Sequence, residues 1–97
     1  MIKTQKILIS HIAQQREGNI ESDMDGEKVM LNLENGKYYN LGGTGGVIWD
    51  LMKEPISISK IIDRLLLEYD VERSECEEQV MEFINLLNDD GLLILES

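Results

Sequence analysis

The sequence is poor in the residues that metal, redox and disulfide-rich proteins need. Its 97 residues include one cysteine, one histidine and one proline. A single cysteine cannot form an internal disulfide, which agrees with a reducing compartment. Neither Cys76 nor His11 has a companion nearby in sequence that would make a nucleophile, an acid–base pair or a metal site. We therefore expect no metal, no cofactor, no catalytic residue and no enzymatic activity.

Basic residues and long apolar runs are also scarce. The chain has 9 Lys and Arg against 19 Asp and Glu, a formal net charge of −10. Affinity for nucleic acids comes largely from Lys and Arg contacts to phosphates, so this balance opposes a nucleic-acid partner. The apolar runs are far shorter than the roughly 20 residues of a membrane span, and no secretory signal is evident at the N-terminus. We expect a cytoplasmic protein with no membrane partner.

The length fits one domain over residues 1–97, with roughly the first 15 residues loosely ordered apart from a short strand at 7–10. Two turn dipeptides, Asp25-Gly26 and Asn35-Gly36, then divide an alternating segment into strands. The alternation places these strands at about 18–24, 28–34 and 37–41 and predicts an antiparallel meander. On the middle strand Val29, Leu31 and Leu33 share one face, and Met30, Asn32 and Glu34 share the other.

Helical spacing replaces the alternation from Thr44 onward and predicts three helices. The first ends before Pro55, because proline disfavours helical geometry in the residue before it. Ser57 is a fair N-cap for the second, which ends near Asp70. The third begins at a capping box, Ser74-Glu75-Cys76-Glu77, and stops at Gly91, after which 92–96 form an extended segment. The apolar stripes of the last two helices are Ile58, Ile61, Ile62, Leu65, Leu66 and Tyr69, and Cys76, Val80, Phe83, Ile84 and Leu87.

The glycine-rich stretch 42–46 looks at first like a phosphate-binding loop. The dinucleotide pattern G-x-G-x-x-G, started at Gly43, reaches Ile48 where its last glycine should stand. The P-loop needs serine or threonine after Gly-Lys, and Gly36-Lys37 precedes a tyrosine instead. The acids around the first hairpin fail as a calcium loop, because Asn32 occupies the position of the required glutamate. We interpret the glycines as a tight strand-to-helix corner whose backbone passes close to a neighbour.

The segment Lys37-Tyr38-Tyr39-Asn40-Leu41 is unusual for the edge of a sheet. If the meander runs in sequence order, this strand leaves backbone donors and acceptors unpaired on one side. Sheet edges normally carry protective charge or proline, whereas this one has a single lysine and two tyrosines, which offer large contact area. A free aromatic edge beside an amphipathic helix is suited to binding an extended peptide by strand addition.

These residues resemble a known family. The run DGEKVMLNLENGKYYNL, residues 25–41, followed by Gly45 and by Ile48-Trp49-Asp50-Leu51, closely resembles the pattern of PqqD-like proteins. These proteins are also called the peptide recognition elements of ribosomally made, modified peptide (RiPP) pathways. The resemblance continues through Tyr69-Asp70-Val71 and covers about residues 20–95. The short chain is most similar to the discrete recognition proteins of lasso peptide biosynthesis.

The resemblance implies a winged-helix-like α+β fold, with a three-stranded antiparallel sheet followed by three helices. Family members bind the leader segment of a precursor peptide as an added strand against the third strand, in a cleft closed by the third helix. They deliver the precursor to separate enzymes, which in lasso pathways are a leader-cleaving cysteine protease and an ATP-dependent cyclase. Carried onto this chain, the pairing edge is Tyr38, Tyr39, Asn40 and Leu41, and the groove contacts are Val80, Phe83, Ile84 and Leu87.

Two other interpretations remain at this point. A winged-helix DNA-binding regulator would share the fold but should have a basic recognition helix, and the third helix here is rich in acids. A small redox or metal enzyme would need partners for Cys76 or His11. One departure from the family pattern is Gly42-Gly43, where a polar residue and often proline are common. A non-catalytic peptide-binding adaptor is the leading hypothesis.

Overall fold

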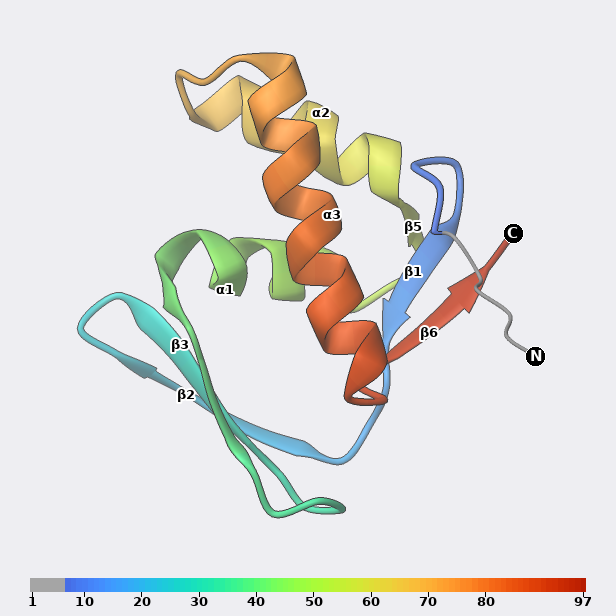
Figure 1. Cartoon of the computed structure of the whole chain (residues 1–97). Coiled ribbons are helices and arrows are strands. Elements are labelled where there is room, and N and C mark those ends of the chain that lie inside the picture. Colours follow the sequence, from blue (N-terminus) through green and yellow to red (C-terminus); the bar gives the residue numbers. More distant parts are fainter. Residues whose placement is uncertain (1–6) are drawn as a thin grey trace.

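The computed structural model describes residues 7–97, which form two small sheets and three helices (Figure 1). The elements are β1 (Ile12–Gln15), β2 (Asn19–Met24), β3 (Glu27–Asn32), β4 (Tyr38–Leu41), α1 (Gly42–Leu51), β5 (Ile56–Ser57), α2 (Ile58–Glu68), α3 (Arg73–Asp89) and β6 (Leu93–Glu96). The predicted α+β, winged-helix-like fold, with a three-stranded antiparallel sheet followed by three helices, is confirmed.

The sheet β2-β3-β4 is the predicted meander in sequence order. Asp25 and Gly26 both have positive φ, 55° and 81°, which is the geometry of the tight turn expected between β2 and β3. The middle strand ends at Asn32, two residues earlier than predicted. The Asn32 side-chain oxygen accepts the backbone N–H groups of Glu34 and Asn35, at 3.0 and 2.8 Å, and these bonds begin the turn.

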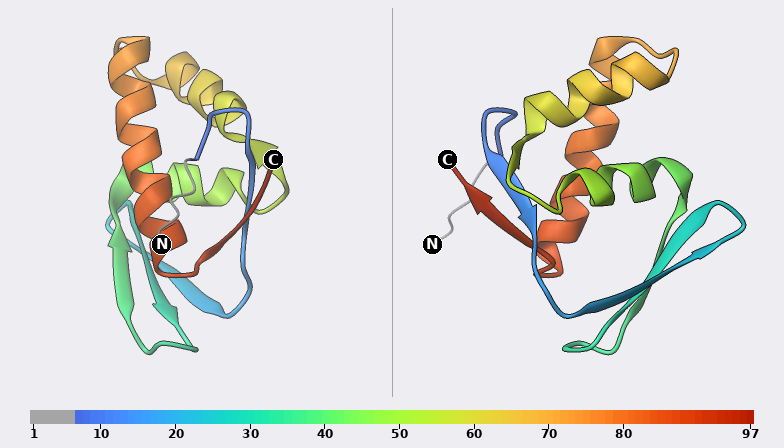
Figure 2. Two further views of the ribbon diagram at one scale, coloured as in Figure 1. Left: turned by 45° about the vertical axis from the view of Figure 1, so that its right-hand side comes forward. Right: turned by 180° about the vertical axis from the view of Figure 1, so that it is seen from behind.

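The core side of this sheet is the Met30 and Asn32 face, because both side chains are buried. Asn32 is satisfied there, since its amide also donates to the side-chain oxygen of Asn19 at 2.8 Å. Val29 and Leu31 lie on the opposite face and are half-buried. All three helices lie on the Met30 side of the sheet, as the views in Figure 2 show.

A second sheet, in the order β5-β1-β6, was not predicted. It joins the two ends of the described chain, with Ile12 opposite both Ser57 and Glu96. The strand expected at 7–10 is wrong, because the chain turns there: Leu8 N–H donates to His11 Nδ1, and His11 N–H donates to the Leu8 carbonyl, each at 3.0 Å. The extended segment expected at 92–96 is confirmed as β6.

Two helix starts differ from the prediction, and α2 ends at Glu68, two residues before the expected Asp70. Helix α1 begins at Gly42, directly after β4 and before the expected Thr44. Helix α3 begins at Arg73 after Glu72, and no side chain caps it. The capping box is therefore wrong: Ser74 already lies inside the first turn, where Cys76 N–H donates to the Glu72 carbonyl at 2.9 Å. The expected N-cap of α2 is confirmed, since the Ser57 hydroxyl accepts from Lys60 N–H at 3.2 Å.

The core forms where α1, α2 and α3 meet the inner sides of the two sheets. Trp49 of α1 is fully buried and is the largest side chain of the core. The other buried apolar residues are Ala13, Met30, Ile48, Met52, Ile58, Ile61, Ile62, Leu65, Cys76, Val80, Ile84, Leu87, Leu92 and Leu93. The apolar stripes predicted for α2 and α3 supply many of these side chains, which is what holds the helices on the sheets.

Two glycines of α1 allow close packing on both sides of that helix. A Cβ placed on Gly46 would lie 2.9 Å from Lys28 Cβ on β3. A Cβ on Gly45 would lie 3.1 Å from the Phe83 ring and 3.3 Å from Leu41 Cβ. The expected close approach of backbone to a neighbour is therefore found at these two positions, within the helix rather than at its entrance.

The Gly46 contact makes a testable prediction about stability. Gly46→Ala should lower the free energy of unfolding by about 1–3 kcal/mol, because β3 must move to accept the methyl group. The matched control is Gly43→Ala in the same helix, where the nearest atom would be the Gly26 carbonyl at 3.8 Å. That variant should gain up to about 1 kcal/mol of stability from helix propensity. Denaturant unfolding measures both, and equal effects would contradict the packing argument.

Candidate functional site

The outer edge of β4 has no neighbouring strand in the part of the chain that the structure describes. On the other side, Met30 pairs with Tyr39, and Asn32 N–H donates to the Lys37 carbonyl at 2.9 Å. Antiparallel pairs alternate between bonded and non-bonded positions, so the Tyr39 backbone faces β3. The N–H and C=O groups of Tyr38 and Asn40 therefore point toward the open side. The edge offers two residues for main-chain hydrogen bonding.

The side chains of β4 alternate between the two faces of the sheet. Tyr39 points toward α3, where its hydroxyl donates to Asp90 Oδ2 at 2.8 Å and accepts from Asn35 Nδ2 at 3.0 Å. Burial raises the pKa of Tyr39, and the hydrogen bond to Asp90 raises it further. Leu41 also points inward, whereas Tyr38 is largely exposed on the other face. The Tyr39–Asp90 bond ties the start of β4 to the end of α3.

A pocket of about 440 Å³ lies beside the other end of β4. Its wall is mostly apolar and comes from the end of β4, from α1, from the end of α2 and the loop after it, and from α3. The lining residues are Leu41, Thr44, Gly45, Ile48, Leu65, Tyr69, Asp70, Val71, Cys76, Gln79, Val80 and Phe83. Leu41 belongs to both the open edge and the pocket, so the two form one continuous surface.

The predicted site residues separate into three groups. Tyr38, Tyr39, Asn40 and Leu41 form β4, as expected. Phe83 and Val80 line the pocket from α3, Phe83 half-buried and Val80 buried. Ile84 and Leu87 are buried in the core and do not line the pocket.

Sequence reasoning missed the part of the pocket that follows α2. Tyr69, Asp70 and Val71 line it from the loop. Their place in the family pattern was the signal for them, together with the helical apolar stripe in the case of Tyr69. Leu86, an exposed residue, follows Phe83 by three positions and by helical spacing lies on the same flank of α3. An exposed leucine next to a pocket-lining phenylalanine extends the apolar surface of α3 toward Asp90.

The sequence matches the family described as coenzyme PQQ synthesis protein D (PqqD) over residues 27–93. The chain belongs to the PqqD family. The resemblance identified from the motifs is therefore confirmed. PqqD proteins are non-catalytic peptide-binding adaptors, so the expectation that this chain is not an enzyme is confirmed by its family.

Two solved structures are similar to this PqqD protein. TbiB1 in complex with the TbiA(beta) leader peptide is 30% identical, with a TM-score of 0.74 over 82% of this chain and 93% of that one. Lasso peptide synthetase B1 complexed with the leader peptide is 23% identical, with a TM-score of 0.73 over 84% of this chain and 96% of that one, and supports the fold. The comparison with curated proteins finds no match.

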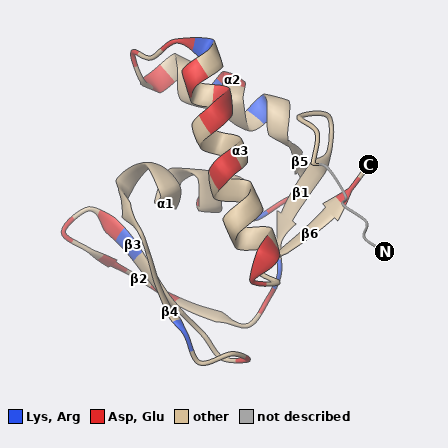
Figure 3. Ribbon diagram, in the orientation of Figure 1, with Lys and Arg blue, Asp and Glu red and all other residues tan. Residues whose placement is uncertain are grey.

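Charge on α3 of the PqqD protein opposes the DNA-binding interpretation. Glu75, Glu78 and Glu82 are exposed on this helix, and acidic residues dominate its outward side (Figure 3). Arg73 is bound to Asp63 and Glu77, each at 3.1 Å. A recognition helix needs unpaired cations for phosphate and base contacts, and α3 presents mainly carboxylates.

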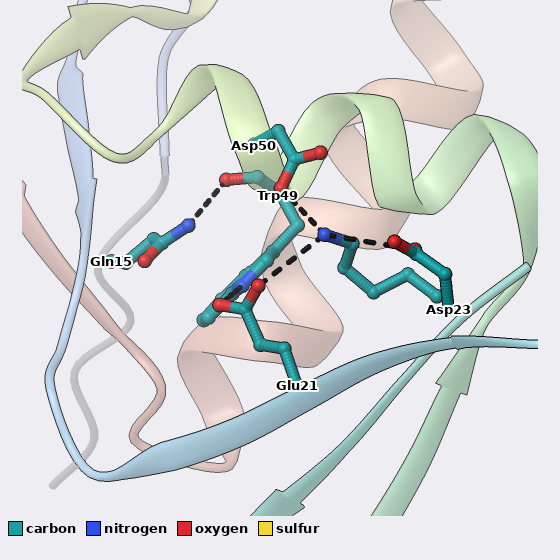
Figure 4. A network of polar contacts seen from close by, with 6 residues as sticks. Gln15, Glu21, Asp23, Trp49 and Asp50 are labelled. Atoms are coloured by element: carbon teal, nitrogen blue, oxygen red, sulfur yellow. Dashed lines mark hydrogen bonds and ion pairs between the residues drawn. The ribbon is translucent and has the colours of Figure 1, made fainter.

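A polar network holds α1 against the sheet (Figure 4). Lys28 Nζ on β3 lies 2.9 Å from Asp50, 3.3 Å from Glu21 and 3.9 Å from Asp23. The hydrogen bond to Asp50 is the main cause of a raised Lys28 pKa. Trp49 Nε1 donates to Glu21 at 2.8 Å, and Gln15 Nε2 donates to the Trp49 carbonyl at 2.7 Å. The network links β1, β2, β3 and α1 around the buried tryptophan.

Among residues 7–97, no three or more His, Cys, Asp or Glu side chains gather where they could hold a metal ion. In the same part of the chain, no helix has the length and apolarity needed to cross a membrane.

Cys76 lines the pocket, and its environment disfavours reactivity of the thiol. It is buried, and burial raises the pKa of the thiol, although Arg73 acts in the opposite direction. A raised pKa lowers the thiolate fraction at neutral pH, and the thiolate is the reactive form. Cys76 therefore serves as part of the pocket wall.

This environment predicts slow chemical modification. Iodoacetamide should alkylate Cys76 in the native protein at least about tenfold more slowly than in the unfolded chain at the same mildly alkaline pH. Mass spectrometry over time measures both rates, with guanidinium chloride supplying the unfolded control. Equal rates would show that the thiol is open to solvent and that the pocket wall is not closed around it.

Proposed function

We propose that this protein binds the leader segment of a ribosomally made precursor peptide as an added strand on β4. The observation that carries the proposal is the open β4 edge, with its outward Tyr38 and Asn40 backbone groups, continuous through Leu41 with an apolar pocket. Membership of the PqqD family, and similarity to a protein whose structure was solved with a leader peptide, support it.

Strand addition divides recognition between main chain and side chains. Hydrogen bonds to Tyr38 and Asn40 give affinity with little dependence on peptide sequence, each contributing about 0.5–1.5 kcal/mol. Alternate side chains of the added strand face α3, and the pocket beside Leu41 accepts an apolar side chain there. Phe83 and the exposed Leu86 supply the surface of α3 along which the inward side chains lie.

The bound precursor is then presented to separate enzymes in the cytoplasm. We propose a leader-cleaving cysteine protease and an ATP-dependent cyclase, with a lasso peptide as the product. The similarity to lasso peptide synthetase B1 and to TbiB1, both solved with leader peptides, supports this assignment. The adaptor itself contributes binding and presentation, which require no catalytic residue.

The backbone direction at Asn40 gives a sharp test. Asn40→Pro removes an N–H group that points to the open side, so it should weaken leader binding by about 1–3 kcal/mol, or about 5- to 150-fold in Kd. The fold should survive, because that N–H has no partner in β3. The probe is a fluorescently labelled leader peptide, beginning with that of TbiA(beta), titrated by anisotropy.

The matched control is Asn40→Ala. It removes the same side-chain bonds, to Gly42 N–H and to Glu27, but keeps the backbone donor. It should therefore bind the leader much closer to the wild-type level than the proline variant does. If the two variants bind equally while both are folded, the peptide does not add to the β4 edge.

A further inference from the structure

The outer face of the β2-β3-β4 sheet is apolar although it faces away from the helices. Its side chains form rows across the three strands, because Ile20 pairs with Leu31 and Leu31 pairs with Tyr38. Val29 occupies the next row, and Met24 lies beyond it. On a sheet with one solvated face, that face normally carries polar side chains.

These side chains are open to solvent to an unusual degree. Ile20 is 56% exposed, Met24 61% and Tyr38 75%. Single exposed apolar residues are common on protein surfaces, but here Ile20, Leu31 and Tyr38 are cross-strand neighbours, and Val29 adjoins them along β3. Met24 is diagonal to Val29 and lies opposite Glu27, while Ser22 and Asn40 are the cross-strand neighbours of Val29. We call the patch formed by Ile20, Met24, Val29, Leu31 and Tyr38 the outer sheet patch.

The charges at the border of the outer sheet patch are mainly acidic. Asp25 and Glu27 lie at the end formed by the β2–β3 turn, and Glu34 lies in the turn at the other end. Lys37 is also near that end, but its Nζ lies 3.9 Å from Asp90 and is partly neutralised by it. In a dimer formed through this patch, the carboxylates of one copy would face those of the other, and each copy carries a formal net charge of −10. The two copies would therefore repel each other. This charge pattern opposes self-association and favours a partner with basic residues around an apolar patch.

We propose that the outer sheet patch is the docking surface for the leader-cleaving protease, whose substrate segment is the strand bound beside the patch. This inference rests on the proposed function. The enzyme would cover the patch with apolar side chains and place lysine or arginine opposite Asp25, Glu27 and Glu34.

Continuity with the peptide-binding edge is the second argument. Tyr38 presents its backbone to the open side of β4 and its side chain to the outer sheet patch. A protein docked on the patch therefore lies directly beside the added strand, without blocking the pocket, which opens on the opposite side of the sheet. One sheet thus holds the peptide at its edge and the enzyme on its outer face.

Ile20→Arg tests the docking surface. Ile20 lies on β2, the strand farthest from the open edge, so the variant leaves the peptide site untouched. The arginine places a positive charge in the apolar contact, and this charge repels the lysine and arginine side chains expected around the partner's surface. The affinity of the Ile20→Arg variant for the protease should be at least about tenfold lower than that of the wild type. The probe is a purified leader-cleaving cysteine protease of the same pathway, and a purified ATP-dependent cyclase is measured separately, both by biolayer interferometry.

The control is Leu67→Arg, which introduces the same charge at an exposed leucine on α2, 83% exposed and outside the patch. It should leave enzyme binding unchanged. A loss of protease binding with Ile20→Arg alone supports the inference, while unchanged protease binding, or a loss confined to the cyclase, overturns it. Sedimentation that shows a wild-type dimer, dissociated by Ile20→Arg, would also overturn it, because the occupant would be a second copy.

Leader titration separates this inference from the function on which it rests. Wild type, Ile20→Arg and Leu67→Arg should bind the labelled leader with equal affinity. If none of them binds the leader, the proposed function fails, whatever the enzyme measurements show. If all bind it and Ile20→Arg still binds the protease at the wild-type level, only the docking surface fails.

Discussion

The seating of α1 on β3 is the contact on which the rest of this structure depends. Gly46 lets the helix approach Lys28 so closely that a single methyl group would collide with the strand. The Lys28 side chain, only 12% exposed, then passes the helix and binds carboxylates of β2 and α1. The pKa of Lys28 is raised above its value in the unfolded chain, near 10.5. This stabilisation is therefore fully present at pH values below 10.5, and it is lost as the pH rises through the pKa of the folded state. Removal of the cation would leave several carboxylates beside a buried tryptophan without a counter-charge.

This seating also forms the proposed peptide site. Helix α1 follows β4 with no intervening residue, so the position of the helix sets the direction of the open strand. Its other side meets α3 through Gly45, where the absence of a side chain leaves room for the Phe83 ring. The pocket lies where these contacts meet the end of α2. The glycine-rich stretch therefore acts through close packing on both sides of a helix, and this explains why it fits no phosphate-loop pattern.

The predictions from sequence succeeded where the signals are local and failed where distant segments meet. The hairpin at Asp25-Gly26 and the cap at Ser57 depend on neighbouring residues, and both are confirmed. The pairing of Ile12 with Glu96 joins segments at opposite ends of the described chain, and nothing in either segment specifies the other. Helical spacing also placed Ile84 and Phe83 on one apolar face of α3. Phe83 lines the pocket and Ile84 is buried in the core, and this difference depends on how α2 and the sheets pack against α3.

The two inward residues of β4 are not equivalent, and this difference can set the register of an added strand. Main-chain bonding alone allows a peptide to slip by two residues, because every second position of an edge offers the same donor and acceptor. At one end, the Tyr39 hydroxyl is bound to Asp90, which ties β4 to the end of α3. At the other end, Leu41 opens into the pocket. An apolar side chain of the peptide therefore has one place to enter, and entry there aligns the remaining residues along Tyr38 and Asn40. Affinity from the backbone and register from one pocket together let a surface without catalytic groups select a particular precursor.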